Sequence, residues 1–369
     1  MKTATNKTTV VEALRAVAAR VIPPKMTAAV LYGSEDLRIE KIDVPAVSAD
    51  EVLLRVRLAL TDGTDLKVWR RGYHAKMIQP PAVFGHEVVG EIVEVGKRVD
   101  PRWRVGMRVI AANSAPCLRC YHCRRGQENL CEDLLFNNGA YAEFMRIPGR
   151  IVTENMLEVP HSVDDASAAL VEPLACGLRG IHEMELRTGD TAVVIGCGPI
   201  GLKFVRMLSR RGVRVIALAR RSAPLDVAKK LGANYVINVT DTADIVAAVK
   251  QLTEDQRGPD AVVEAAGNPS TWKLALGMVR RGGVINFFSG LPRGTMVELE
   301  AAAMHYAEIK LISTFHHTPR FIREGLEAIK RGDITAQDFV TEEISLADLP
   351  QAFERMKSRS GEIKLAVRP

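Results

Sequence analysis

The sequence predicts an α/β protein with two domains, a small barrel of short strands and a doubly wound parallel sheet. A chain of 369 residues is long enough for both. Up to about residue 155 short strands alternate with turns, as at 51–60, where Arg55 and Arg57 alternate with apolar side chains. Beyond residue 184, apolar runs alternate with helical stretches, and this alternation is typical of a parallel sheet covered on both faces.

This pattern also divides the chain. We expect an N-terminal extension over 1–25 and a first domain over 26–176, which the C-terminal segment 318–369 completes. The parallel-sheet domain is expected to occupy 177–317. Within the first domain, glycines mark the bulges and corners of the barrel, at positions 85, 90, 96 and 106.

The composition limits the function classes. The net charge is +6, but the basic residues are scattered among acids and no aromatic and basic platform is present, which argues against a nucleic-acid partner. No apolar run reaches the roughly 20 residues of a membrane helix. Charged residues interrupt 10–22, which excludes a secretory signal and leaves open a transit peptide, a surface helix or a disordered leader. We expect a soluble, cytoplasmic protein without a membrane partner.

Four of the six cysteines, Cys117, Cys120, Cys123 and Cys131, lie close together in the sequence, within a lobe that we place at 113–135. Gaps of two residues let a short loop wrap around one ion, so the spacing predicts a tetrahedral thiolate zinc site. Because all four positions would be filled by protein, such a zinc is structural. The alternative is a redox-active or empty thiol cluster.

A glycine-rich turn follows the strand expected at 191–195 and opens the next helix. It reads Gly196-Cys197-Gly198-Pro199-Ile200-Gly201. Between a strand and a helix, this spacing predicts a dinucleotide site: the first glycine allows the tight turn, the second the approach of the pyrophosphate, and the third close packing of the helix. The alternative is a glycine-rich turn without a ligand.

The end of the next strand indicates which dinucleotide binds. An NAD enzyme carries an acid there that bonds the ribose hydroxyls. This chain has Ala219, followed by Arg220 and Arg221. The missing carboxylate removes repulsion of a 2′-phosphate, and two guanidinium groups supply donors to it. We therefore predict NADP(H) in preference to NAD(H), unless both arginines face solvent.

Three further motifs carry a family resemblance, together with the cysteine lobe and the glycine turn. They are Asp62-Gly63-Thr64-Asp65, Gly85-His86-Glu87 and Val171-Glu172-Pro173-Leu174. In these motifs the chain resembles the zinc-dependent medium-chain dehydrogenases of the alcohol dehydrogenase superfamily, in particular the polyol branch related to sorbitol dehydrogenase. The resemblance covers nearly everything after Met26. It implies a GroES-like barrel as the catalytic domain and a Rossmann domain for the nucleotide.

The resemblance also implies a catalytic zinc. It makes His86 a ligand, Glu87 a ligand or a carboxylate just behind the ligands, and Glu172 a ligand held directly or through water. Asp62 stands where most relatives carry Cys. Aspartate is itself a competent zinc ligand, so we expect the metal to remain. The alternative is that the site has lost it.

The same comparison assigns proton and substrate contacts. Thr64 matches the hydroxyl that passes the substrate proton toward the cofactor ribose, whereas Lys67 stands where several relatives have a histidine. It also makes Phe315, His316 and His317 substrate contacts, although the two histidines could instead cap a loop or touch the cofactor amide. Trp69 is expected beside the substrate because it follows the Asp62 motif.

The resulting prediction is a zinc-dependent, NADP(H)-preferring dehydrogenase that interconverts a secondary hydroxyl and a ketone on a polyol, sugar or cyclitol, or on a simpler secondary alcohol. A homodimer or homotetramer is expected from the family. Two alternatives stay open. One is a metal-independent enoyl or quinone reductase of the same superfamily, and the other is a non-catalytic nucleotide-binding sensor.

Overall fold

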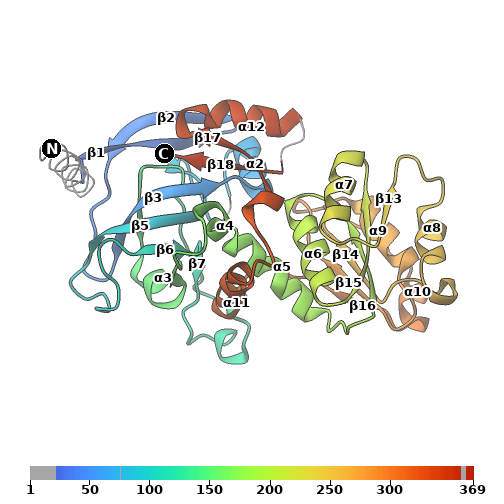
Figure 1. Cartoon of the computed structure of the whole chain (residues 1–369). Helices are drawn as coiled ribbons and strands as arrows, with labels where there is room; N and C mark the ends of the chain where they lie inside the picture. The colour runs from blue at the N-terminus through green and yellow to red at the C-terminus, as the bar shows by residue number, and fades with distance from the viewer. Residues whose placement is uncertain (1–21, 75, 359–362) are drawn as a thin grey trace, which may run out of the picture.

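The computed structural model describes residues 22–74, 76–358 and 363–369, and it confirms the predicted α/β fold. Two units lie side by side, one built on antiparallel strands and one on a parallel sheet, with helix α5 (Val171–Glu183) between them (Figure 1). Most of the predicted N-terminal extension lies outside the described residues. Among the described residues, no helix has the length and apolar character needed to cross a bilayer.

The parallel sheet has the strand order β13-β12-β11-β14-β15-β16, and every neighbouring pair in it is parallel. The strands are β11 (Thr191–Ile195), β12 (Arg214–Ala219), β13 (Tyr235–Asn238), β14 (Ala261–Glu264), β15 (Val284–Phe287) and β16 (Lys310–Ile312). The chain winds outward from β11 in one direction and from β14 in the other. Such a reversal opens a crevice at the carboxyl ends of the two central strands, where ligands of doubly wound sheets bind.

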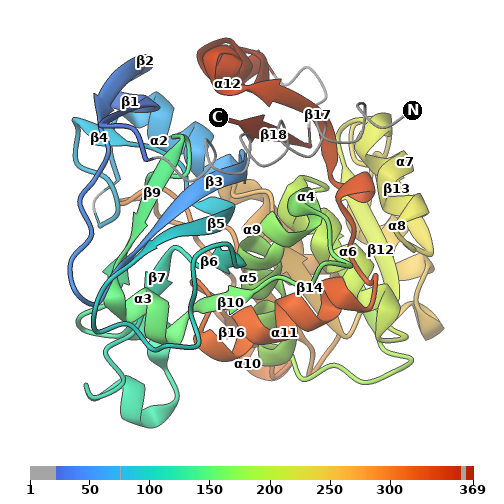
Figure 2. The ribbon, with the colours of Figure 1, turned by 60° about the vertical axis from the view of Figure 1, so that its left-hand side comes forward.

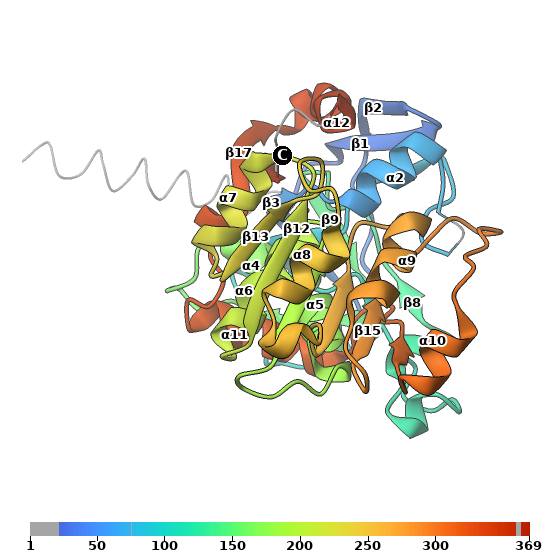
Figure 3. The same cartoon turned by 90° about the vertical axis from the view of Figure 1, so that its right-hand side faces the viewer.

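Both faces of this sheet are buried, because alternate side chains of each strand point to opposite sides. Ala192 and Val194 share a core with α5 and α6, whereas Val193 and Ile195 share another with α8 and α9. The helices α8 and α9 lie side by side over their face (Figure 3). The helices of this unit are α6 (Pro199–Arg210), α7 (Ser222–Lys230), α8 (Ile245–Gln251), α9 (Pro269–Met278) and α10 (Ala301–Tyr306).

The other unit holds a larger sheet of order β10-β6-β5-β3-β18-β17, with β9 also paired to β3, and two smaller sheets, β2-β1-β4 and β7-β8. Its strands before the C-terminal segment are β1 (Lys25–Gly33), β2 (Asp36–Asp43), β3 (Val52–Leu60), β4 (Ala82–Val83), β5 (Glu87–Val95), β6 (Arg108–Ala111), β7 (Ser114–Ala115), β8 (Leu135–Phe136), β9 (Phe144–Ile147) and β10 (Met156–Glu158). Its helices are α2 (Gly63–Arg71), α3 (Gly149–Glu154) and α4 (Asp165–Ala169).

Gly90 lies where β3 and β5 change register, between Val56 and Leu58. A Cβ at this position would come within 2.8 Å of the carbonyl oxygen of Arg55. The extra residue of this bulge is Arg57 of β3, and Gly90 lies opposite it on β5, where a larger side chain would clash with the β3 backbone.

The C-terminal segment returns to the antiparallel unit (Figure 2). It contains α11 (Pro319–Lys330), β17 (Val340–Ser345), α12 (Leu349–Ser358) and β18 (Lys364–Arg368). Strand β18 pairs antiparallel with β3 and parallel with β17, and α11 packs on α5. This arrangement carries Lys364 to the end of β3, beside the Asp62 motif.

Candidate active site

The four clustered cysteines converge, as their spacing predicts. Their sulfur atoms all lie within 4.8 Å of one another. All six cysteines of the chain are free thiols. Backbone N–H groups, with that of Arg119 contributing most, lower the pKa of Cys117 to about 6, whereas burial raises the pKa of Cys123 to about 12. Because thiolates are the form that binds metal, the cluster is consistent with zinc binding.

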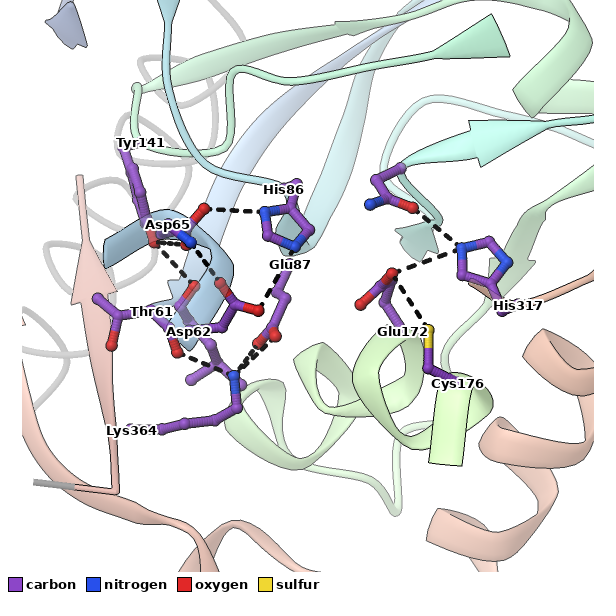
Figure 4. A network of polar contacts seen from close by, with 12 residues as sticks. Thr61, Asp62, Asp65, His86, Glu87, Tyr141, Glu172, Cys176, His317 and Lys364 are labelled. Carbon is purple, nitrogen blue, oxygen red and sulfur yellow. Dashed lines mark hydrogen bonds and ion pairs between the residues drawn. The ribbon is translucent and has the colours of Figure 1, made fainter. Parts of the chain in front are cut away.

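A second polar cluster begins at the N-terminus of α2. Asp62 caps this helix, and its carboxylate accepts a hydrogen bond of 2.7 Å from the backbone N–H of Asp65. Asp65 points inward and lies 2.9 Å from Nδ1 of His86 (Figure 4). The other Asp65 oxygen accepts a bond of 2.5 Å from the hydroxyl of Tyr141. Asp65 therefore orients His86, whose Nε2 faces Asp62 at 3.9 Å.

The field in this cluster favours a cation. Burial alone would lower the pKa of His86, but Asp65, Asp62 and Glu172 outweigh it and raise this pKa well above its ordinary value. Burial would likewise raise the pKa of Asp62, yet His86 and Lys364 hold it below its usual range. Carboxylates that stabilise a protonated imidazole would stabilise a divalent ion in the same place.

Glu87 is fully buried at the start of β5 and is paired with Lys364. The lysine Nζ lies 2.7 and 2.6 Å from the two Glu87 oxygens and 2.8 Å from the carbonyl oxygen of Thr61 (Figure 4). Burial raises the pKa of Glu87, and Lys364 opposes that shift. Glu87 also lies within 4.8 Å of the donor atoms of His86 and Glu172. Its position fits a carboxylate behind the ligands better than a ligand, because both oxygens are already bonded to the ammonium group.

Glu172 comes from the first turn of α5 and reaches the cluster from the opposite side (Figure 4). Burial and the repulsion of Asp62 raise its pKa, against the attraction of His86. Its Oε1 also lies 3.5 Å from Nε2 of His317. Thr64 lies in the first turn of α2, and Lys67 is exposed on the same helix. Elements distant in sequence thus bring Asp62, His86 and Glu172 together.

The segment after β16 joins this cluster. His317 donates from Nε2 to Oδ1 of Asn113 at 2.9 Å, and Nε2 of His316 lies 2.6 Å from the hydroxyl of Ser114. Arg179 of α5 donates to the carbonyl oxygens of Phe315 and His316, at 2.7 and 3.3 Å. The Phe315 side chain is exposed. Both histidines therefore face the cluster, and Phe315 lies at its margin.

The glycine turn has the backbone that a dinucleotide requires. Gly196 has φ +98°, in the left-handed region. A Cβ at Gly201 would lie 1.8 Å from the carbonyl oxygen of Gly196, whereas one at Gly198 would meet nothing within 4 Å. The first glycine thus makes the turn, the third packs the helix, and the second leaves open space at the N-terminus of α6, which is suited to an anion.

Two family models match the chain. The alcohol dehydrogenase GroES-like domain matches residues 48–158, and the zinc-binding dehydrogenase domain matches residues 199–331. The chain belongs to the zinc-type medium-chain dehydrogenases.

Its relatives place the dehydrogenase in the polyol branch. It is 32% identical over 356 residues to the sorbitol dehydrogenase of Bacillus subtilis, covering 94% of this chain and 98% of that protein. It is 31% identical to D-arabinitol dehydrogenase 1 of Uromyces fabae, over 95% of this chain and 99% of that one. Among solved structures, a zinc-binding dehydrogenase of Sinorhizobium meliloti bound to NADP superposes with a TM-score of 0.86 at 27% identity, over 94% of this chain and all of the other.

One predicted substrate contact of the dehydrogenase is wrong. Trp69 is only 2% exposed, and its ring stacks on Phe353 at 5.6 Å within the core of the antiparallel unit. The prediction relied on its nearness to Asp62 in sequence. Because α2 turns its Val68 and Trp69 side into the core, the ring has no free surface to offer a substrate.

Three residues near the dehydrogenase site were missed by the sequence reasoning. Lys364 begins β18 and stands between Ile363 and the apolar residues of that strand, and a lysine within an apolar run is a usable signal. Tyr141 and Asn113 left no comparable signal, because tyrosine and asparagine are common at strand ends and in turns. Only the fold shows that they bond Asp65 and His317.

Proposed function

We propose that the protein is a zinc-dependent, NADP(H)-preferring dehydrogenase that interconverts a secondary hydroxyl and a ketone on a polyol, sugar or cyclitol, or on a simpler secondary alcohol. The observation that carries this proposal is that His86 belongs to two groups of converging donor atoms, one with Asp62 and Asp65 and the other with Glu87 and Glu172, while Asp65 is bonded behind it. The matches to sorbitol, arabinitol and erythritol/L-threitol dehydrogenases support a polyol substrate.

A divalent ion at this position would supply Lewis acidity to the substrate oxygen, while the nicotinamide exchanges hydride with the carbon. Asp62, His86 and Glu172 would hold the ion. Asp65 accepts a hydrogen bond from Nδ1–H of His86, which leaves the lone pair of Nε2 on the side of Asp62. Thr64 would receive the proton of the substrate hydroxyl. Thr64 would at the same time pass its own proton toward the ribose hydroxyls of the cofactor. Lys67 stands at the place of the family's histidine and is exposed on α2, but an ammonium group has no lone pair with which to accept a proton.

We infer that a nucleotide bound at the glycine turn, where α6 begins, would lie near the polar cluster. Lys203, two residues after Gly201, is fully buried, and the charges of Lys364, Glu87, Asp62 and Glu172 all act on its pKa. The helix that begins at the glycine turn therefore passes next to the polar cluster. This proximity supports hydride transfer between a nicotinamide and a substrate held at that cluster.

NADP(H) preference rests on the end of β12. Ala219 ends this strand, and Arg220 and Arg221 follow it before α7. Both arginines are exposed, so the alternative that they face solvent stays open, and the Arg220→Glu variant described below decides between the two. The Sinorhizobium meliloti structure, which is bound to NADP, supports the same choice.

We also propose a homodimer or homotetramer that acts in the cytoplasm. Strand β16 lies at the end of its sheet, and Leu311 is 38% exposed on it, so this edge is open to pairing with a second copy. The free state of all six cysteines suits a reducing compartment. The division of the chain after residues 176 and 317 stays a prediction.

The test combines kinetics with zinc analysis of the full chain. We expect a higher kcat/KM with NADP⁺ than with NAD⁺ on a panel of polyols, cyclitols and simple secondary alcohols. Arg220→Glu should reduce that ratio about tenfold, since a charge-assisted contact contributes about 1.5–3 kcal/mol. Arg187→Glu, which changes another exposed arginine, is the matched control and should leave the ratio unchanged.

Three results would contradict parts of this proposal. A preference for NAD⁺ would overturn the cofactor assignment. Zinc found only at the cysteine cluster, with reduction of enones or quinones, would favour the metal-independent reductase. Binding of NADPH without turnover of any hydroxyl, ketone, enone or quinone would favour the sensor.

A further inference from the structure

We propose that Glu172, His316 and His317 form a second position for a divalent transition-metal cation, adjacent to the first and sharing Glu172 with it. One donor atom from each of these residues lies within 4.8 Å of the other two. The proposal depends on this geometry and not on the reaction proposed above, although both use Glu172.

Glu172 stands between two groups of ligating side chains. On one side are His86 and Asp62, and on the other is His317 (Figure 4). The Oε1 atom of Glu172 lies 3.5 Å from Nε2 of His317, a spacing that two ligands of one ion adopt when each is about 2.0–2.2 Å from it. A carboxylate has two oxygens, so it can face an ion on each side.

The backbone at His316 is what brings the two imidazoles together. Successive side chains of an extended segment point to opposite sides. His316 instead has φ +68°, in the left-handed region, and the ring centroids of His316 and His317 are 4.0 Å apart. A non-glycine residue in this region costs about 1 kcal/mol or more. Arg179 holds the conformation, because its guanidinium bonds the carbonyl oxygens of Phe315 and His316.

The surroundings suit a cation with open coordination positions. Oδ1 of Asn113 lies 2.9 Å from Nε2 of His317, and the hydroxyl of Ser114 lies 2.6 Å from Nε2 of His316. In the arrangement described here, His317 donates its Nε2 proton to Asn113. An ion would displace that proton, and the Asn113 oxygen would then face the ion as a further ligand.

The donor set defines the class of ion. Two imidazoles and one carboxylate, with oxygen donors at the margin, bind first-row divalent cations such as Co²⁺ and Zn²⁺ and leave positions open. This set differs from the thiolate cage, which offers sulfur only. With Glu172 between the two positions, the polar cluster would hold a pair of ions joined by that carboxylate.

The experiment counts ions in four forms of the full chain: wild type, His86→Ala, His317→Ala and the double variant. Each is dialysed against Co²⁺, and total metal per chain is measured by mass spectrometry. We expect each single variant to lose one equivalent relative to wild type, and the double variant to lose two. His305→Ala, which removes an exposed histidine of α10, is the matched control and should lose none.

The outcomes separate this proposal from the proposed reaction. If His317→Ala keeps the wild-type metal content while His86→Ala loses one equivalent, the second position is wrong and the first stands. If His317→Ala loses one equivalent and His86→Ala loses none, the second position stands and the first is wrong. Should His317→Ala fail to fold, His316→Ala removes the other imidazole and must lose the same equivalent.

Discussion

The cysteine cage, formed by Cys117, Cys120, Cys123 and Cys131, and the polar cluster of Asp62, His86, Glu87 and Glu172 both consist of side-chain types that bind metals, but they are built differently. The cage is local, since its four sulfurs come from residues 117–131. The polar cluster is assembled from the start of α2, the start of β5 and the first turn of α5. The sulfur donors of the cage are soft and would fill every position of a tetrahedral ion. The donors of the polar cluster are carboxylate oxygens and an imidazole, and they would leave positions open.

The two regions also differ in what they do to stability. A filled thiolate cage contributes folding free energy to a lobe that has little core of its own. The polar cluster and its surroundings bury charged groups, among them Glu87, Lys364 and Lys203. Burial of a charge costs free energy unless an opposite charge or hydrogen bonds stabilise it. A filled cage would therefore stabilise the fold, whereas the polar cluster would be maintained by it.

The largest expected effect is on turnover at the polar cluster. His86→Ala should lower kcat/KM by about 10³-fold or more, since a bound ion supplies several kcal/mol of transition-state stabilisation. The affinity for NADPH should change by less than about twofold, because the ligand residue and the glycine turn lie on different units. Steady-state kinetics and a fluorescence titration with NADPH measure the two effects.

Retained turnover in His86→Ala would contradict a catalytic role for a metal ion at the polar cluster. A large loss of NADPH affinity would show instead that the variant disturbs the nucleotide site.

The next effect is on stability at the cage. Cys120→Ser should release one zinc and lower the free energy of unfolding by about 3 kcal/mol or more, a fraction of what thiolate zinc sites supply to small peptides. Zinc analysis and thermal denaturation measure it. Turnover should fall far less than in His86→Ala, although Asn129 of the lobe bonds the carbonyl oxygen of Phe315 at 3.2 Å and transmits some disturbance.

Cys197→Ser is the matched control, because it makes the same chemical change away from both groups of metal-binding side chains. It should keep the zinc content, and its melting temperature should change far less than that of Cys120→Ser. An unchanged melting temperature in Cys120→Ser after loss of zinc would contradict a stabilising cage.

The smallest expected effect is on the unfolding free energy and comes from a buried charge beside the polar cluster. Lys203 is fully buried, and its Nζ lies 4.6 Å from the ring centroid of Phe339. Burial is the main cause that lowers its pKa from 10.5 to about 7. Between these two values the unfolded chain binds more protons than the folded one, so the unfolding free energy rises with pH across this window and the cost is greatest at pH 7 and below.

Lys203→Met should therefore stabilise the protein by about 2 kcal/mol near neutral pH, after an allowance for the lost contact with Phe339, and the gain should shrink toward pH 10. Melting temperatures of both proteins at a series of pH values measure it. Lys230→Met, on the exposed end of α7, should show no such pH dependence. A difference between Lys203→Met and wild type that is constant with pH would contradict the buried charge.

Much of the fold could be predicted from the sequence because its signals are local. The alternation of apolar runs and helical stretches predicted the parallel sheet, and the positions of Gly196 and Gly201 predicted the turn that follows β11. The same reasoning placed Asp62, His86 and Glu172 in one cluster only through a family resemblance, since no spacing relates residues so far apart. Trp69 shows where such reasoning fails. Its place in the sequence predicted a substrate contact, but its ring packs on Phe353 in the core.

By itself the sequence determined the cysteine cage, the glycine turn and the order of the elements, because each depends on contacts between near neighbours along the chain. The tertiary structure alone decided that Lys364 neutralises Glu87 across 277 residues, that Tyr141 bonds Asp65 behind His86, and that His316 and His317 face Glu172 together. The physical reason is that burial sets which charges must be paired. Only the packed chain shows which partner lies within reach.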